Sequence, residues 1–367
     1  MRVRAVTLRD FRGYDNVEVQ LGPGLTVVSG PNGAGKTNLL EAVYYGCTGR
    51  SCRTNNDREV LRRGATSARV VVQAQADDGM HEFSVGFTPG EPKRIRADGA
   101  LVERLLDITV RPLVGVFLPD RLELVKGAPA VRRAHIDQLV AALWPARPAT
   151  RRAYVQALAQ RNALIAQIRS GRASRAALPG WDRQLAEHGT RLMSDRAGAV
   201  DAVAERFTRL ATDLGLSEPA ILSYRPRSRA GTADELAAEL TEHLDSDLER
   251  GFTGHGPHRD DLLLTHGGLD LRVYGSQGQQ RLALLALLLA ERDAIGARRD
   301  APPLMLLDDV MSELDGARRQ ALAELLRNRG QAVVTTTDLE HVPGALEDDV
   351  TRIAVRDARV MDEAAVS

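Results

Sequence analysis

An eight-residue segment near the N-terminus has the residue types that bind a nucleoside triphosphate. The pattern G-x-x-x-x-G-K-[ST] is met at every fixed position by Gly30, Pro31, Asn32, Gly33, Ala34, Gly35, Lys36 and Thr37. Glycines let backbone N–H groups turn towards a polyphosphate without a Cβ atom in the way. Lys36 supplies a positive charge for the outer phosphates, and the hydroxyl of Thr37 is a ligand for Mg²⁺. The segment therefore predicts a site for a nucleotide with Mg²⁺.

Two carboxylates late in the chain are suited to the same reaction. Asp308 and Asp309 follow the apolar residues 304–307, which predict a buried strand. A buried strand holds an acid rigidly beside Mg²⁺, and this is the Walker B arrangement. We expect Asp308 to hold the metal ion, directly or through water. Asp309 would act on the attacking water, where many related ATPases use Glu, and the shorter side chain leaves the hydrolysis rate open.

The elements around the glycine-rich segment must position it. Residues 25–28 form an apolar, β-branched run that predicts a buried strand, and residues 37–43 are apolar at helical spacing. A strand, a glycine-rich loop and a helix in this order bring the positive end of the helix to the phosphates. A glycine-rich turn that binds nothing is the weaker interpretation in this context.

Composition favours ATP over GTP. The chain has 367 residues, of which 43% are hydrophobic and 27% charged, and its formal net charge is zero. A GTP site usually reads guanine with N-K-x-D, yet the residues before Lys36, Lys93 and Lys126 are Gly, Pro and Val, and the other basic residues are arginines. The neutral balance gives no global indication of nucleic-acid binding.

The sequence predicts a cytoplasmic protein. Cys47 and Cys52 are the two cysteines, too few for a disulfide scaffold or a zinc cluster. The chain starts with a strand pattern rather than a signal peptide. The longest apolar stretch, residues 282–290, is about half the length of a membrane span, so no membrane partner is expected.

Several short strings together resemble one family. The chain opens with a strand, an F-R-x-Y turn at residues 11–14 and a second strand before the glycine-rich loop. S-x-G-Q at residues 276–279 and S-x-L-D at residues 312–315 are typical of ABC-type ATPases. F-x-P-D at 117–120, G-x-P-x-x-R-R at 127–133 and G-P-H-R-D-D-L at 256–262 are more specific. With these strings the chain resembles the RecF family of SMC-like ATPases along nearly its whole length.

This resemblance implies an α/β fold, an ABC/SMC-type P-loop ATPase head with an inserted helical lobe. It implies that Arg12 reaches the bound phosphates, although a solvated turn arginine is an equal alternative. Thr337 stands where the class usually carries a switch His. The γ-phosphate held by the opposite subunit would be contacted by Ser276, Gln277, Gly278 and Gln279.

We expect the inserted lobe to be an arm of two long helices. Residues 149–168 and 181–214 have helical periodicity and are joined by a loop with Gly and Pro. The expected domains are the first part of the ATPase head at residues 1–126, the arm at 127–216, and the second part of the head at 217–367.

The arm is locally basic. Residues 138–181 include seven arginines and no Asp or Glu, which is the footprint of a phosphate-binding surface. The alternative is a solvated face in a chain that is rich in arginine throughout. The predicted DNA contacts are Arg161, Arg169, Arg172 and Arg175.

The resemblance also implies a function. A member of this family would be an ATP-dependent DNA-binding protein of recombinational repair that recognises gaps and single-strand–double-strand junctions. It would close as a homodimer with ATP, reopen on slow hydrolysis, and help RecR and RecO to load recombinase. Three alternatives remain: a transporter ATPase subunit, a chromosome tether of the SMC type, and an ATPase switch that acts on a protein without DNA.

Overall fold

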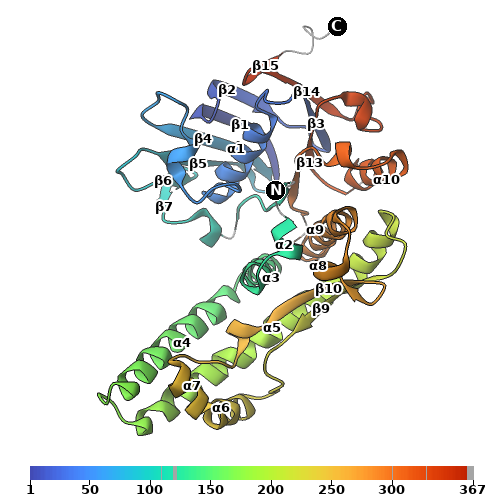
Figure 1. The fold of residues 1–367 in the computed structure, drawn as a ribbon. Coiled ribbons are helices and arrows are strands. Elements are labelled where there is room, and N and C mark those ends of the chain that lie inside the picture. Colours follow the sequence, from blue (N-terminus) through green and yellow to red (C-terminus); the bar gives the residue numbers. More distant parts are fainter. Residues whose placement is uncertain (109, 119–121, 300, 328, 362–367) are drawn as a thin grey trace. The chain divides into compact units, whose positions relative to one another are not determined.

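The computed structural model describes residues 1–108, 110–118, 122–299, 301–327 and 329–361 (Figure 1). The chain divides into two compact units. Unit 1 comprises Met1–Arg121 and Ile295–Ser367, and unit 2 comprises Leu122–Ala294. Among the helices described, none combines the length and the apolar character needed to cross a bilayer.

Unit 1 contains a sheet with a parallel core. The strand order is β15-β14-β3-β13-β12-β8; β15 pairs antiparallel with β14, and the other pairs are parallel. Every residue of β12 and β13 is buried, the pattern of strands covered on both faces. The strands are β3 (Leu25–Ser29), β8 (Val114–Phe117), β12 (Leu304–Leu307), β13 (Ala332–Thr336), β14 (Thr351–Arg356) and β15 (Arg359–Met361).

A second sheet in unit 1 is antiparallel, with the strand order β2-β1-β4-β5-β6-β7. Buried and more exposed residues alternate along most of β4, as expected when one face of a sheet packs on the core. The strands are β1 (Arg2–Phe11), β2 (Tyr14–Gln20), β4 (Ala68–Ala76), β5 (Gly79–Phe87), β6 (Arg94–Ala97) and β7 (Ala100–Val102).

Helix α1 (Lys36–Thr48) packs against both sheets of unit 1. It contacts β1, β4 and β5 of the antiparallel sheet and β8, β12 and β13 of the parallel sheet. Gly46 permits the close approach to β4, because a Cβ atom there would lie 2.4 Å from Cγ2 of Val72. Helix α10 (Gly316–Arg327) belongs to the same unit. The predicted strand and helix around the glycine-rich loop are thus confirmed.

The two long helices of the predicted arm are present in unit 2 (Figure 1). They are α4 (Pro148–Arg169) and α5 (Leu178–Asp213), and each has Pro in its first turn, where a missing N–H is tolerated. Tyr154 shares an apolar cluster with Leu192, and Ile165, nearer the end of α4, shares another with Leu178. The helices therefore run antiparallel, as predicted.

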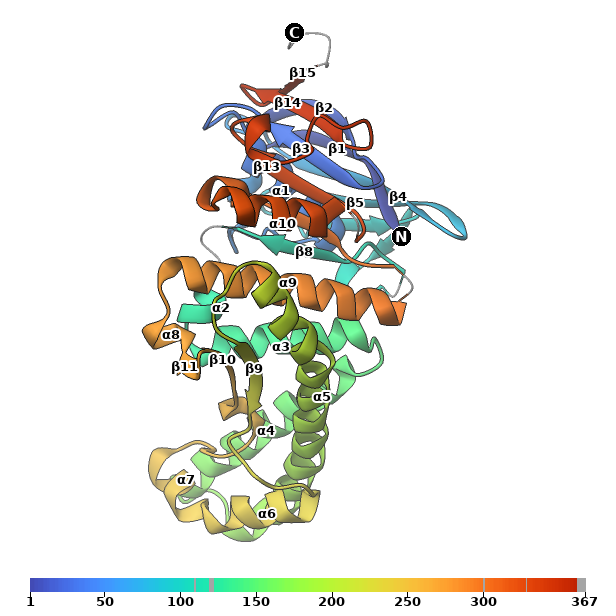
Figure 2. The same cartoon turned by 90° about the vertical axis from the view of Figure 1, so that its right-hand side faces the viewer.

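The predicted domain boundaries are wrong, because unit 2 extends well beyond residues 127–216. Residues 217–367 were expected to return to the head, but residues 217–294 stay with the helices, and both β9 and α6 contact α5 (Figure 2). Strand β9 pairs with β10 in a three-stranded sheet inside unit 2. The other elements are α2 (Glu123–Lys126), α3 (Pro129–Leu143), β9 (Ala220–Arg225), α6 (Ala233–Glu242), α7 (Leu244–Arg250), β10 (Asp261–His266), β11 (Leu269–Asp270), α8 (Leu271–Tyr274) and α9 (Gln277–Arg299).

Two of the family-specific strings pair with each other inside unit 2. Arg132 of the G-x-P-x-x-R-R string forms a bidentate ion pair with Asp261, at 2.7 and 2.9 Å. Arg133 donates to the backbone oxygen of Asp260 at 2.8 Å. These contacts hold α3 to the start of β10, so both strings have a structural role. The last two residues of F-x-P-D, 119 and 120, lie outside the described residues.

Candidate nucleotide-binding site

The glycine-rich loop joins the end of β3 to the start of α1. Gly33 and Gly35 have φ angles of 80° and 113°, in the left-handed region that favours glycine. A Cβ atom at Gly30 would lie 2.1 Å from the backbone oxygen of Val355, so no larger residue fits there. Pro31, Asn32 and Gly33 are exposed, while Ala34 and Lys36 are buried. The loop therefore presents backbone at the N-terminus of α1, as an anion site requires.

The side chain of Lys36 folds back over this loop. Its Nζ donates to the backbone oxygens of Gly30 at 2.6 Å and Pro31 at 3.0 Å. Burial lowers the pKa of Lys36, and the nearby carboxylates of Asp309 and Asp308 oppose that shift. The ammonium is thus held beside the loop. Its N–H groups, which now donate to backbone oxygens, can donate to phosphate oxygens instead.

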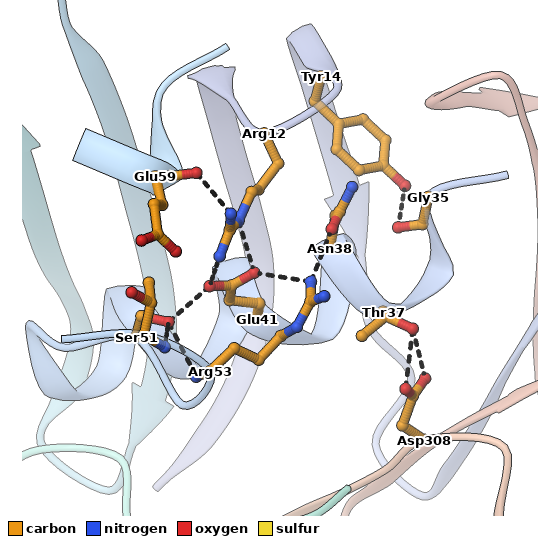
Figure 3. A network of polar contacts seen from close by, with 11 residues as sticks. Arg12, Tyr14, Gly35, Thr37, Asn38, Glu41, Ser51, Arg53, Glu59 and Asp308 are labelled. Carbon is orange, nitrogen blue, oxygen red and sulfur yellow. Dashed lines mark hydrogen bonds and ion pairs between the residues drawn. The ribbon is translucent and has the colours of Figure 1, made fainter. Parts of the chain in front are cut away.

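The structure brings Thr37 and Asp308 together from segments far apart in sequence. The Thr37 hydroxyl lies 2.8 Å from Oδ2 and 3.0 Å from Oδ1 of Asp308 (Figure 3). A hydroxyl and a carboxylate are hard oxygen ligands, the kind that Mg²⁺ prefers, and both lie where the loop would hold phosphates. The two residues therefore fit the magnesium ion expected from the sequence.

Asp309 is held in an unusual conformation next to Asp308. Its φ is 47°, in the left-handed region, and its N–H donates to Oγ1 of Thr335 at 2.9 Å. Its Oδ1 is buried and has no hydrogen-bond partner within the described residues. A buried, unsatisfied carboxylate oxygen is costly unless a ligand or water meets it. This agrees with a role for Asp309 towards a water molecule.

Arg12 lies beside α1 and is not a free turn arginine. Its Nε and Nη2 donate to the two oxygens of Glu41 at 2.8 and 2.7 Å, and Nη1 donates to the backbone oxygen of Glu59 (Figure 3). Arg53 also contacts Glu41, at 3.3 Å, and donates to Oδ1 of Asn38 at 3.1 Å. A solvated turn arginine, one of the two alternatives, is excluded by these contacts. A contact of Arg12 with phosphate stays a prediction.

Sequence reasoning missed four residues at this site. Glu41 and Arg53 complete the network around Arg12, and the Tyr14 hydroxyl donates to the backbone oxygen of Gly35 at 3.1 Å (Figure 3). Thr335 contacts both Asp308 and Asp309. Residue type alone gives no signal for Glu41 or Thr335, because each acts through partners that the fold brings to it.

The S-x-G-Q string begins helix α9 in unit 2. Ser276 Oγ accepts from the N–H of Gln279 at 3.2 Å, and Gln279 Oε1 accepts from the N–H of Ser276 at 2.8 Å. This is a reciprocal capping box, so an N-cap function is present. Ser276, Gln277 and Gly278 are exposed and can meet another molecule. A contact with a partner's phosphate remains a prediction for these residues.

The prediction that Arg161 contacts DNA is wrong. Its side chain is 0% exposed and forms ion pairs with Asp182 at 2.6 Å and with Asp247 at 2.7 Å. It also donates to Oγ1 of Thr253 at 2.7 Å. Arg161 is therefore an internal linker of α4, α5 and α7, out of reach of a nucleic acid.

Carboxylates from elsewhere in unit 2 neutralise other arginines of the acid-free stretch. Arg147 pairs with Asp195 at 2.9 Å, and Arg175 pairs with Asp245 at 2.7 Å. The Arg175 pair is exposed on both sides and weak. Exposed arginines of the stretch without a carboxylate partner in the described chain are Arg152, Arg169 and Arg172.

The comparisons with known proteins agree with this geometry. A RecF protein of Myxococcus xanthus, called DNA replication and repair protein RecF, is 38% identical over 98% of this chain and 97% of its own length. One of Streptomyces avermitilis is 36% identical over 98% of this chain and 99% of its own length. The chain belongs to the RecF family. An AAA domain model matches residues 5–98.

Solved structures of the family support the fold. The recombination mediator protein RecF with ATP, in the RecFOR pathway, has a TM-score of 0.84 and 25% identity, covering 98% of this chain and 97% of that one. An SMC head bound to the C-terminal winged-helix domain of ScpA has a TM-score of 0.59 and 16% identity, covering 98% of this chain and 96% of the other, and shows the fold alone. The ABC/SMC-type ATPase fold predicted for this family member is thus confirmed.

Proposed function

We propose that this RecF family member binds and hydrolyses Mg·ATP. The proposal rests chiefly on the Thr37–Asp308 contact of 2.8 Å beside a buried, unsatisfied oxygen of Asp309. Lys36 and the loop N–H groups would hold the phosphates, and Asp309 would accept a hydrogen bond from the attacking water. The water oxygen would bond to the γ-phosphorus as the bond to the bridging oxygen breaks, so ADP leaves with the bridging oxygen and the γ-phosphoryl group leaves as inorganic phosphate. The proton that the water loses would pass by way of Asp309 to phosphate or solvent. Bound between Thr37 and Asp308, Mg²⁺ would neutralise charge on the phosphates.

Hydrolysis is tested by phosphate release from the purified chain with Mg·ATP. Lys36→Met is the matched variant, because it removes the ammonium but keeps a side chain of similar length. We expect the wild-type chain to release phosphate and the variant to release none above background. Equal rates would assign the activity to a contaminant.

We further propose that ATP closes a homodimer. The family resemblance supplies the geometry: the loop of one subunit and Ser276–Gln279 of its partner enclose one ATP. The exposure of Ser276, Gln277 and Gly278 supports the proposal, because a composite site needs this face free. Sedimentation with ATP, with ADP and without nucleotide should give a dimer chiefly with ATP. Asp309→Asn should trap that dimer, since ATP binding survives while activation of water is removed.

We also propose that the arm contacts DNA phosphates through Arg169, Arg172 and Arg175. Removing one such arginine–phosphate interaction should flatten the slope of log K against log salt by about 0.9, for all sequences alike. The test is the triple Arg→Ala variant on gapped DNA over a range of salt. The control removes the same charge from Arg2, Arg4 and Arg9, which are exposed on β1. A slope unchanged by the arm variant, or equally flattened by the control, would place the DNA contacts elsewhere.

The biological role proposed is that of the family. In the cytoplasm this protein would recognise gaps and single-strand–double-strand junctions and help RecR and RecO to load recombinase. Its ATPase would be slow and stimulated by DNA, as suits a switch. The test is phosphate release with and without gapped DNA, and stimulation by the DNA would support this role. An ATPase that no DNA stimulates, but that binds another protein with ATP, would favour a switch acting on a protein or membrane partner.

A further inference from the structure

Thr335 is the fourth of the five residues of a buried strand, and the three residues before it are apolar. It belongs to β13, its exposure is 0%, and it follows Ala332, Val333 and Val334. A hydroxyl in such a place costs free energy unless both its donor and its acceptor functions are used. The residue in this position therefore requires an explanation beyond packing.

The hydroxyl of Thr335 connects the two carboxylate residues of the nucleotide site. Its O–H donates to Oδ1 of Asp308 at 2.7 Å, and its oxygen accepts the backbone N–H of Asp309 at 2.9 Å. The backbone N–H of Asp309 can only donate and the carboxylate of Asp308 accepts, so the single proton of the hydroxyl is directed to Asp308. The side chain of Thr335 thus contacts both Asp308 and Asp309.

Each contact fixes something different. The bond to Oδ1 of Asp308 limits rotation of that carboxylate, so that Oδ2 stays towards Thr37, 2.8 Å away. The bond to the N–H of Asp309 supports a backbone with φ of 47°, which a non-glycine residue adopts only when its surroundings hold it. That backbone sets the direction in which the Cβ atom of Asp309 points.

We propose that Thr335 is a positioning residue for ATP hydrolysis, a role that rests on the proposed ATPase function. Its hydroxyl is used by Asp308 and Asp309, so it acts through these two residues. It orients the metal-binding carboxylate of Asp308 and the water-directing residue Asp309 together, so that both are in place before ATP binds. Outer-shell partners of metal ligands typically contribute about 10–100-fold to activity or affinity.

The test is the variant Thr335→Val, which keeps the shape of the side chain and removes the hydroxyl. Steady-state kinetics with Mg·ATP should show kcat lowered about 10–100-fold, with the Kd for ATP within about threefold of wild type. Thr335→Ser restores the hydroxyl and should recover most of kcat. A merely structural role would lower stability without this split between kcat and Kd, and rescue by serine assigns the effect to the hydroxyl.

The matched control is Thr26→Val. Thr26 is also 0% exposed and lies in the same sheet on β3, but its hydroxyl accepts from the N–H of Gly22 at 3.0 Å, away from both carboxylates. We expect this control to lose stability while keeping kcat. If Thr335→Val does not fold, Thr335→Ala takes its place and the same split is expected.

Three results would overturn the role of Thr335. They are a wild-type kcat in the hydroxyl-free variant, an equal loss of kcat in Thr26→Val, and no recovery in Thr335→Ser. Failure of the underlying ATPase function would give a different result: the wild-type chain would release phosphate no faster than Lys36→Met. The two failures are therefore distinguishable in one set of assays.

Discussion

Arg12 and Glu41 form a bidentate ion pair beside the P-loop helix, with N···O distances of 2.8 and 2.7 Å. The Glu41 side chain is 0% exposed and that of Arg12 is 18% exposed. Ser51 and Arg53 contact the same carboxylate, so Glu41 joins α1, the turn between β1 and β2, and the loop after α1. Arg12 would therefore have to share its donors, or leave Glu41, in order to bind phosphate.

Replacing Glu41 should be costly for unit 1. Glu41→Gln removes the charge that two guanidinium groups share, and leaving a partly buried charge unpaired costs about 3 kcal/mol. We expect the free energy of unfolding, measured in urea, to fall by about that amount. Glu18→Gln, an exposed change of the same kind on β2, should shift it by less than about 0.5 kcal/mol. Similar values for the two variants would mean that the Arg12–Glu41 pair contributes no net stability.

Arg161 should be essential to unit 2 and irrelevant to the electrostatics of DNA binding. Arg161→Met leaves Asp182 and Asp247 buried without their cation, which costs about 3–5 kcal/mol. The exposed Arg172→Ala should cost less than about 0.5 kcal/mol but flatten the salt dependence of DNA binding. Urea unfolding and salt titrations on the same two proteins check both statements. If Arg161→Met flattened the salt dependence without loss of stability, Arg161 would again be a candidate for a contact with DNA.

The acid-free stretch shows where sequence reasoning stops. Residues 138–181 contain no carboxylate themselves, yet Asp182 and Asp247 reach Arg161 and Asp245 reaches Arg175 in the fold. A local charge count cannot include partners from other elements. The boundary at residue 216 is wrong for a similar reason, because the pairing of β9 with β10 depends on contacts between segments far apart in sequence.

The sequence predicts those residues of the nucleotide site that are contiguous or that end a strand, and the structure brings Thr37 and Asp308 together. Nucleotide binding by these residues stays a prediction. The loop from Gly30 to Thr37 is set by one short segment, and Asp308 is set by the end of a buried strand. Thr335 and Glu41 were missed because their function depends on which strand lies beside which, and on how the loop after α1 folds back. Pairing of β13 with β12 and β3 is what brings Thr335 to the carboxylates.

Acid should weaken unit 2 through His258. The Tyr154 hydroxyl lies 2.7 Å from its Nδ1, and its Nε2 lies 2.9 Å from the backbone oxygen of Thr253, which favours the neutral ring with the proton on Nε2. Burial, with help from the positive charges of Arg259 and Arg133, lowers the pKa of His258 from 6.5 to about 4. The neutral form is therefore the one that the fold accepts.

The sign of the pH effect follows from proton binding. Below pH 6.5 the unfolded chain binds a proton at His258, whereas the folded chain binds it only near pH 4. The free energy of unfolding therefore falls as pH falls across this window. At pH 5 the decrease should be about 2 kcal/mol. His258→Gln can keep both hydrogen bonds and cannot titrate, so its urea midpoint should depend less on pH between 7.5 and 5. Parallel curves for the two proteins would place the acid sensitivity at other groups.

A shared ATP site predicts that two inactive proteins restore activity when mixed. Lys36→Met disables the phosphate loop, and Ser276→Arg obstructs the partner's γ-phosphate. Each variant alone gives dimers in which both sites are broken. In a random mixture half the dimers are heterodimers, and each of these has one site with wild-type Lys36 and wild-type Ser276. About a quarter of the wild-type sites should therefore return.

Two affinity tags purified in sequence isolate the heterodimer and separate failed pairing from failed catalysis. Phosphate release by the isolated heterodimer, at about half the wild-type rate per dimer, is the expected result, because one of its two sites is intact. Tight ATP binding without hydrolysis would mean that both sites must act together. A heterodimer that binds no ATP would exclude the shared site, because the intact pair of Lys36 and Ser276 would then be insufficient even when assembled.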